Sequence, residues 1–209
     1  MVNIKIRCAE EKDLPAIFRI EKRSYPPELQ APHHILANRM EIFGIRVAEL
    51  NRDLVGFYTC VPVLLDWSKE QNVIDEIQKN RHPHYCRWFE QYRTSQEFNT
   101  LYVTSTAVTT KYQGRGIGKA LVQHSLELAR ENTLAYRASV LRVKGFGKQH
   151  AAGMSIDEYI RSVQMGRISS PILELYLSSG FTLGRPLPEY ESDRASNNYG
   201  IFSFKKVFW

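Results

Sequence analysis

The sequence is poor in cysteine and has no long hydrophobic run. Its 209 residues include three cysteines, Cys8, Cys60 and Cys86, which are widely spaced and form no Cys-x-x-Cys pair. This spacing disfavours a disulfide framework and a zinc site, and it predicts that Cys8 and Cys60 are buried thiols in strands. No apolar run approaches the roughly 18 residues of a membrane-spanning helix. The N-terminal residues alternate apolar and polar types instead of forming a signal-peptide core, so we expect a cytoplasmic protein.

Acidic residues are outnumbered by basic ones, 22 to 28, which gives a net charge of +6 and a pI of about 9.2. A basic patch that attracts phosphate groups or an acidic carrier protein is therefore expected. The sequence shows no zinc-finger spacing and no helix-turn-helix or RNA-binding signature, so nucleic-acid binding is a minor alternative. The histidine groups His33-His34 and His82-Pro83-His84 lack a third ligand, and we predict no metal site.

One stretch, Leu101–Arg130, combines a strand pattern, a glycine loop and a helix pattern. β-Branched and aromatic residues fill 101–110 without glycine or proline, which is typical of a strand. Gly114, Gly116 and Gly118 then alternate with other residues, and an amphipathic helix follows at once. The first turn of such a helix carries unpaired N–H donors and the positive end of the helix dipole. The stretch therefore predicts an anion site, to which Arg115 and Lys119 add positive charge.

The spacing of the glycines in this loop and the residue after Lys119 disfavour two of the ligand classes that bind at helix N-termini. It lacks the G-x-G-x-x-G of dinucleotide folds, and Ala120 follows Gly118-Lys119 where a P-loop has serine or threonine. The remaining pattern, Gln-x-x-Gly-x-Gly after an Ala-Val strand end, resembles the pyrophosphate loop of the GCN5-related N-acetyltransferase (GNAT) superfamily. A glycine turn that binds nothing is the alternative reading of the same residues.

The resemblance implies an α/β fold with a mixed, mostly antiparallel sheet flanked by helices, and acetyl-coenzyme A as the acyl donor. It also implies two groups of binding residues. The pyrophosphate would be held by Gln113, Gly114, Arg115, Gly116, Ile117, Gly118, Lys119 and Ala120. The pantetheine arm and thioester carbonyl would be held by the backbone of Thr106, Ala107 and Val108.

The remaining patterns predict the order of elements within a single domain, 1–209. Strands are expected at 2–7, 45–50, 54–65, 101–110, 138–143, 181–183 and 200–207, and loops at 145–153 and 186–198. Helices are expected to begin at the caps Asp13, Ser155 and Ser170, and after Pro32 and Gly116. An insert at 66–100 carries two short helical patterns and many aromatic residues. Our hypothesis is that this insert forms a lid or wall over the acceptor site.

A second motif, Leu175-Tyr176-Leu177-Ser178-Ser179-Gly180-Phe181, resembles the GNAT segment whose tyrosine lies beside the coenzyme A sulfur. The resemblance implies that Tyr176 protonates the departing thiolate, whereas the apolar face around it also fits a core tyrosine. No sequence motif identifies a general base for the incoming amine. The candidates are His150, Glu49, Glu90 and Glu97, each of which fits a surface or loop position better.

The predicted reaction is transfer of an acetyl group from acetyl-coenzyme A to an amine of a small molecule or peptide. The sequence also resembles GNAT domains fused to carbon-nitrogen hydrolases and GNAT-like loading domains of polyketide synthases. The latter resemblance implies decarboxylation of malonyl-type thioesters with an acyl carrier protein as partner, with Thr104, Thr106 and His150 in the polar roles. A domain that binds the cofactor without transferring the acyl group is a further alternative. The acceptor and the oligomeric state cannot be read from the residues.

Overall fold

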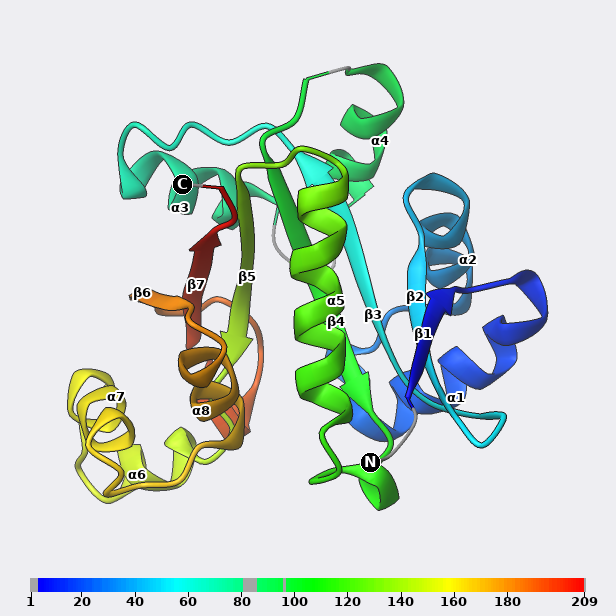
Figure 1. The fold of residues 1–209 in the computed structure, drawn as a ribbon. Coiled ribbons are helices and arrows are strands. Elements are labelled where there is room, and N and C mark those ends of the chain that lie inside the picture. The colour runs from blue at the N-terminus through cyan, green and yellow to red at the C-terminus, as the bar shows by residue number, and fades with distance from the viewer. Residues whose placement is uncertain (1–3, 81–85, 96, 209) are drawn as a thin grey trace. The chain divides into compact units, whose positions relative to one another are not determined.

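The computed structural model describes residues 4–80, 86–95 and 97–208 (Figure 1). The chain forms two compact units, Met1–Arg137 with Lys206–Trp209, and Ala138–Lys205. No helix in the described ranges is long and apolar enough to cross a membrane. The prediction of a single domain stays a prediction, whereas the strands and helices of both units confirm the α/β fold class.

The first unit contains four strands in the order β1-β2-β3-β4, with each neighbouring pair antiparallel. Its strands are β1 Lys5–Cys8, β2 Ile45–Leu50, β3 Asp53–Val63 and β4 Thr100–Val108. Its helices are α1 Leu14–Ser24, α2 His33–Ile42, α3 Glu70–Lys79, α4 Cys86–Thr94 and α5 Ile117–Glu131. Short 3-10 helices occur at Glu11–Asp13, Pro27–Leu29 and Thr110–Tyr112. The elements predicted before residue 66 are thus confirmed where the structure describes them.

The ladder between β3 and β4 contains one irregularity near its middle. Thr59 pairs with Ser105 and Cys60 pairs with Val103, so Thr104 is an extra residue in β4. Such a bulge bends the strand and increases its twist, and it locally interrupts the ladder. The bulge therefore separates the C-terminal part of β4, which leads into the glycine loop, from the regular part of the strand.

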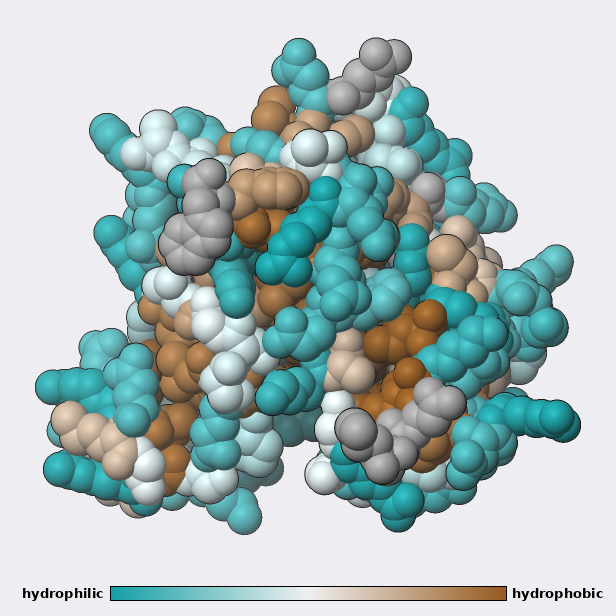
Figure 2. Space-filling model, in the orientation of Figure 1, coloured by the Kyte–Doolittle hydropathy of each residue, from teal (hydrophilic) through white to brown (hydrophobic). Residues whose placement is uncertain are grey.

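Apolar residues of α1, α2 and the strands form the core of the first unit. Ile17, Leu36, Val47 and Phe57 are completely buried there. Helix α5 buries Ile117, Leu121, Ser125 and Leu128, as its period predicts. Its outer face is largely hydrophilic in the view of Figure 2. The amphipathic helix predicted after the glycine loop is therefore confirmed.

The described parts of the insert are anchored by aromatic contacts. The Trp67 ring stacks on Tyr136 with centroids 3.9 Å apart, and its Nε1–H donates to Thr100 Oγ1 at 2.8 Å. Trp88 of α4 is buried against Tyr102 of β4. Both predicted helices are present, as α3 and α4, while the predicted start of the second at Tyr85, and also His82 and His84, lie outside the described residues. The lid hypothesis stays a prediction.

The second unit contains most of β5 Tyr136–Arg142 and β7 Gly200–Lys206, together with β6 Thr182–Leu187. Strand β7 lies between β5 and β6 and runs antiparallel to β6. The helices of this unit are α6 Phe146–Ala151, α7 Ile156–Gln164 and α8 Pro171–Ser178, and a short 3-10 helix spans Arg194–Ser196. The predicted capping box is present, since Ser155 Oγ accepts from the Glu158 N–H and the Glu158 carboxylate accepts from the Ser155 N–H.

The two predicted loops of this unit are wrong in part. Residues 146–151 form helix α6, because the Phe146 ring packs on Tyr159 and Tyr199, whose positions the local pattern did not reveal. Strand β6 extends into the second predicted loop as far as Leu187, and 194–196 form the 3-10 helix.

Three local predictions about single side chains are also wrong. Cys8 lies in β1 but is exposed, whereas Cys60 is buried as predicted. The Asp13 carboxylate does not cap α1, because it is engaged in an ion pair with Arg7 at 2.6 Å. The Ser170 hydroxyl does not cap α8, where instead the Glu174 carboxylate accepts from the Ser170 N–H.

Candidate functional site

The glycine loop has the backbone that an anion site requires. Gly114 and Gly116 adopt the left-handed region, with φ of 75° and 83°, which favours glycine. Gly116 is the N-cap of α5, and the Ala120 N–H donates to its carbonyl at 2.9 Å. The N–H groups that precede Ala120 in the first turn have no helical carbonyl to accept them. Several donors and the positive end of a 15-residue helix therefore face the loop.

The loop also has room and charge for a pyrophosphate. A Cβ added at Gly114 or Gly116 would meet no heavy atom within 4 Å among the neighbours that the structure describes. Glycine is thus required there by the backbone dihedral and not by crowding. Arg115 and Lys119 are exposed beside the same turn. The residues present fit a doubly charged pyrophosphate group, which would accept from the backbone donors and pair with these two cations.

The end of strand β4 is tied directly to this loop. Gln113 Nε2 donates to the Val108 carbonyl at 3.0 Å. On the other side of β4, strand β3 approaches so closely that a Cβ at Gly56 would lie 2.8 Å from the Ala107 carbonyl oxygen. The structure therefore brings together, within the first unit, the residues predicted for the pyrophosphate and those predicted for the pantetheine arm.

The backbone at Thr106 has a partner that the sequence did not indicate. The Tyr25 hydroxyl donates to the Thr106 carbonyl at 2.8 Å and lies 3.2 Å from the Thr106 N–H, which donates to it. Ser105 Oγ donates to the same hydroxyl at 3.0 Å. Tyr25 follows α1 and is separated from β4 by about 80 positions, so no local pattern relates the two segments. It holds the irregular part of β4 in place.

Tyr176 and His150 lie in the second unit. Tyr176 in α8 is 2% exposed, and its ring lies 4.8 Å from that of Phe181, the other aromatic residue of the motif. His150 in α6 is exposed, with its Nδ1 3.4 Å from the Met154 carbonyl oxygen. The buried position of Tyr176 fits both its catalytic assignment and the alternative of a core tyrosine, and the roles of both residues stay predictions.

The other candidate bases have surface or structural positions. Glu49 forms an ion pair with Arg7 at 2.6 Å, and Glu90 and Glu97 are exposed. Thr104, the extra residue of β4, has its Oγ1 2.5 Å from Thr59 Oγ1. Within the described ranges, no group of three or more His, Cys, Asp or Glu side chains is arranged to hold a metal ion.

The sequence is similar to a known protein family and to two proteins of one bacterium. The model of the "Acetyltransferase (GNAT) family" matches residues 14–150, which is more than half of the chain. The "Uncharacterized N-acetyltransferase YkwB" of Bacillus subtilis (strain 168) is 28% identical, over 99% of this chain and 90% of its own length. The "Probable hydrolase YhcX" of the same organism is 29% identical over 93% of this chain, which spans only 37% of that protein.

Solved structures share the fold at lower identity. The GphF GNAT-like decarboxylase in complex with isobutyryl-CoA matches with a TM-score of 0.80 and 20% identity, over 98% of this chain and 100% of that one. The loading GNATL domain of CurA from Lyngbya majuscula matches with a TM-score of 0.80 and 15% identity, over 98% of each chain. The ribosomal-protein-S18-alanine N-acetyltransferase from Escherichia coli has a TM-score of 0.61 and 17% identity, over 99% of this chain and 96% of that one.

Proposed function

Because the chain belongs to the GNAT acetyltransferase family, we propose that it transfers an acetyl group from acetyl-coenzyme A to an amine. The observation that carries the proposal is the pair of left-handed glycines, Gly114 and Gly116, which open the N-terminus of α5 beside Arg115 and Lys119. The name of the relative YkwB, an N-acetyltransferase, supports the same reaction.

In this proposal the donor is held at two places in the first unit. Residues 113–120 bind its pyrophosphate through backbone N–H groups and two cations. The end of β4, residues 106–108, lines the pantetheine arm, and backbone donors there polarise the thioester carbonyl. The Thr106 N–H is engaged by Tyr25, and Ala107 pairs with Phe57 in the β3–β4 ladder, in register with the bond from the Thr109 N–H to the Val55 carbonyl. Val108, whose N–H points away from β3, is therefore the better candidate for that donor.

The chemical step needs one proton at the leaving group. The amine nitrogen attacks the thioester carbonyl, the carbon–sulfur bond breaks, and the thiolate sulfur takes the phenol proton of Tyr176. The amine loses its own proton to a general base, for which our candidate is His150. An acid at this position matters because a thiol is a better leaving group than a free thiolate that must be solvated in a closed site.

A second candidate function is supported by the two structural matches with a TM-score of 0.80, a GNAT-like decarboxylase and a loading domain. In that case the chain would decarboxylate a malonyl-type thioester and pass the acyl group to an acyl carrier protein. Thr104, Thr106 and His150 would then be the polar residues of the reaction.

The experiment measures thiol release with acetyl-coenzyme A and malonyl-coenzyme A across a panel of amines and peptides, with mass analysis of the acyl product. We expect amine-dependent release from acetyl-coenzyme A. Tyr176→Phe should lower kcat by about a hundredfold to ten-thousandfold, the usual contribution of a positioned acid, with little change in donor affinity. Loss of carbon dioxide from the malonyl thioester would instead select the second candidate.

The matched control is Tyr159→Phe, which removes a phenol from another buried tyrosine of the same unit. The Tyr159 hydroxyl contacts the Lys144 carbonyl at 3.5 Å, and we assign it no part in the reaction. If both variants lower kcat equally, or if Tyr176→Phe leaves turnover unchanged, Tyr176 is not the acid.

A further inference from the structure

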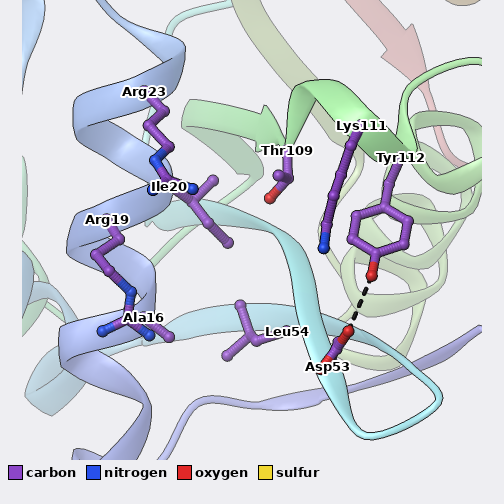
Figure 3. A pocket seen from close by; sticks show the side chains of 9 residues that line it. All are labelled: Ala16, Arg19, Ile20, Arg23, Asp53, Leu54, Thr109, Lys111 and Tyr112. Atoms are coloured by element: carbon purple, nitrogen blue, oxygen red, sulfur yellow. Dashed lines mark hydrogen bonds between the residues drawn. The ribbon is translucent and has the colours of Figure 1, made fainter.

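A cationic cavity lies in the first unit, and the glycine loop does not line it. Its volume is about 230 Å³, and it is formed by α1, the β2–β3 hairpin and the segment after β4 (Figure 3). Residues 113–120, all of which the structure describes, are not among its lining residues. None of the functions discussed above uses this cavity.

Three cations face the cavity from two directions. Arg19 and Arg23 are four residues apart on α1 and so share one face of the helix, and Lys111 reaches in from the short helix after β4 (Figure 3). In the described ranges, no carboxylate lies within 4.0 Å of the charged nitrogens of these three residues. The carboxylate of the lining, Asp53, accepts a hydrogen bond from the Tyr112 hydroxyl at 2.9 Å.

This arrangement favours a small, highly charged anion. Like charges around one cavity raise one another's energy, and a bound anion removes that cost. Guanidinium forks match the oxygens of a phosphate, and the Thr109 hydroxyl adds a donor at the same cavity. Ile20 and Leu54 add apolar surface to the wall, which suits the organic part of a phosphorylated ligand.

We propose that this cavity binds the phosphate monoester of a ligand. Two sources share that chemistry, the 3′-phosphate of coenzyme A and a phosphate on the acceptor. The first source is favoured by the short distance between the cavity and the glycine loop. The Tyr112 ring contacts both the Lys111 ammonium of the cavity, at 4.6 Å, and the Arg115 guanidinium of the loop, at 5.4 Å. The coenzyme A source rests on the proposed function, whereas phosphate binding itself does not.

The first test is a titration of the full chain with inorganic phosphate at low salt, followed by phosphorus NMR or calorimetry. Arg19→Gln with Lys111→Gln should weaken binding by about tenfold or more, since each change removes a charge-assisted hydrogen bond. The control is Lys22→Gln, which removes one positive charge from α1, the helix that carries Arg19. Lys22 lies outside the cavity, with its ammonium over the Phe18 ring at 4.6 Å. Arg19, Lys111 and Lys22 are exposed, so all variants should fold.

The second test compares coenzyme A with its 3′-dephospho form. If the wild type binds coenzyme A more tightly than the 3′-dephospho form and the double variant binds both equally, the cavity binds the 3′-phosphate of the donor. If the preference survives while inorganic phosphate binding is lost, the phosphate belongs to the acceptor. The proposal is wrong if the wild type does not bind phosphate, or if Lys22→Gln weakens binding as much as the double variant. Phosphate binding without any coenzyme A binding would overturn the proposed function alone.

Discussion

At the scale of the residue, the pair Tyr58 and His124 links strand β3 to helix α5. The Tyr58 hydroxyl lies 2.8 Å from His124 Nδ1. Burial raises the pKa of Tyr58, so its phenol stays protonated and donates to Nδ1 of a neutral imidazole. Burial, and then the positive charge of Arg46, lower the pKa of His124 below its ordinary value of 6.5. The unfolded chain therefore binds this proton more readily than the folded one.

The stability of the protein should consequently fall as the pH drops below about 6.5 toward the lowered pKa of His124. His124→Gln keeps a hydrogen-bond acceptor but cannot titrate, so this variant should lose that part of the pH dependence. We would measure the free energy of unfolding in urea at pH 7.5 and pH 5.5. Relative to the wild type, the variant should have a higher free energy of unfolding at pH 5.5 than it has at pH 7.5. An identical difference at both pH values would show that His124 does not titrate in this range.

At the scale of the element, helix α6 shows where the sequence misleads. Gly145 and Gly147 are typical of a loop, yet the backbone dihedral requires glycine at the first position and tertiary packing requires it at the second. Gly145 has a φ of 101°, and a Cβ at Gly147 would lie 2.3 Å from the Arg194 carbonyl oxygen. We expect Gly147→Ala to destabilise the protein by about 1–3 kcal/mol through overpacking, although alanine is ordinarily the better helix former.

Thermal or urea unfolding would measure that cost, with Lys148→Ala as the control on the neighbouring exposed position of the same helix. The control should change stability by about 0.5 kcal/mol or less, as is usual for surface changes. A stabilising effect of Gly147→Ala would mean that the carbonyl of Arg194 moves away at little cost, and that helix propensity decides the outcome.

The elements that could be predicted are those whose signals are local. The glycine loop and α5 follow from dihedral requirements and a helical period, and α7 follows from the capping box of Ser155 and Glu158. Contacts between segments far apart in sequence could not be predicted. Tyr25 meets Thr106, and Arg19 shares a cavity with Lys111, only because the strands and α1 pack together. The anion loop was thus visible in the residues themselves, whereas the support of β4 by Tyr25 and the cavity beside α1 were not.

At the scale of the whole molecule, two half-buried titrating groups, His124 and Glu191, change the stability with pH in opposite directions. Burial raises the pKa of the Glu191 carboxyl to about 7, against a lowering effect of Arg142. The folded chain therefore binds this proton more tightly than the unfolded one, and the stability it contributes is lost as the pH rises toward 7 and above. His124 has the opposite sign over an overlapping range. The free energy of unfolding of the wild type should accordingly depend only weakly on pH between about pH 5 and pH 7.

Single variants should separate the two contributions. Glu191→Gln should be more stable than the wild type at pH 8, by about 1–2 kcal/mol after allowance for partial exposure, and nearly equal to it at pH 4.5. The free energy of unfolding of this variant should rise with pH, because only the titration of His124 then contributes to the pH dependence. The groups that shift the two pKa values are different, Arg46 for one and Arg142 with Asp193 for the other, so the effects should add in the double variant. Urea unfolding of all four proteins across this range tests the argument, and a double variant that keeps the slope of either single variant would refute it.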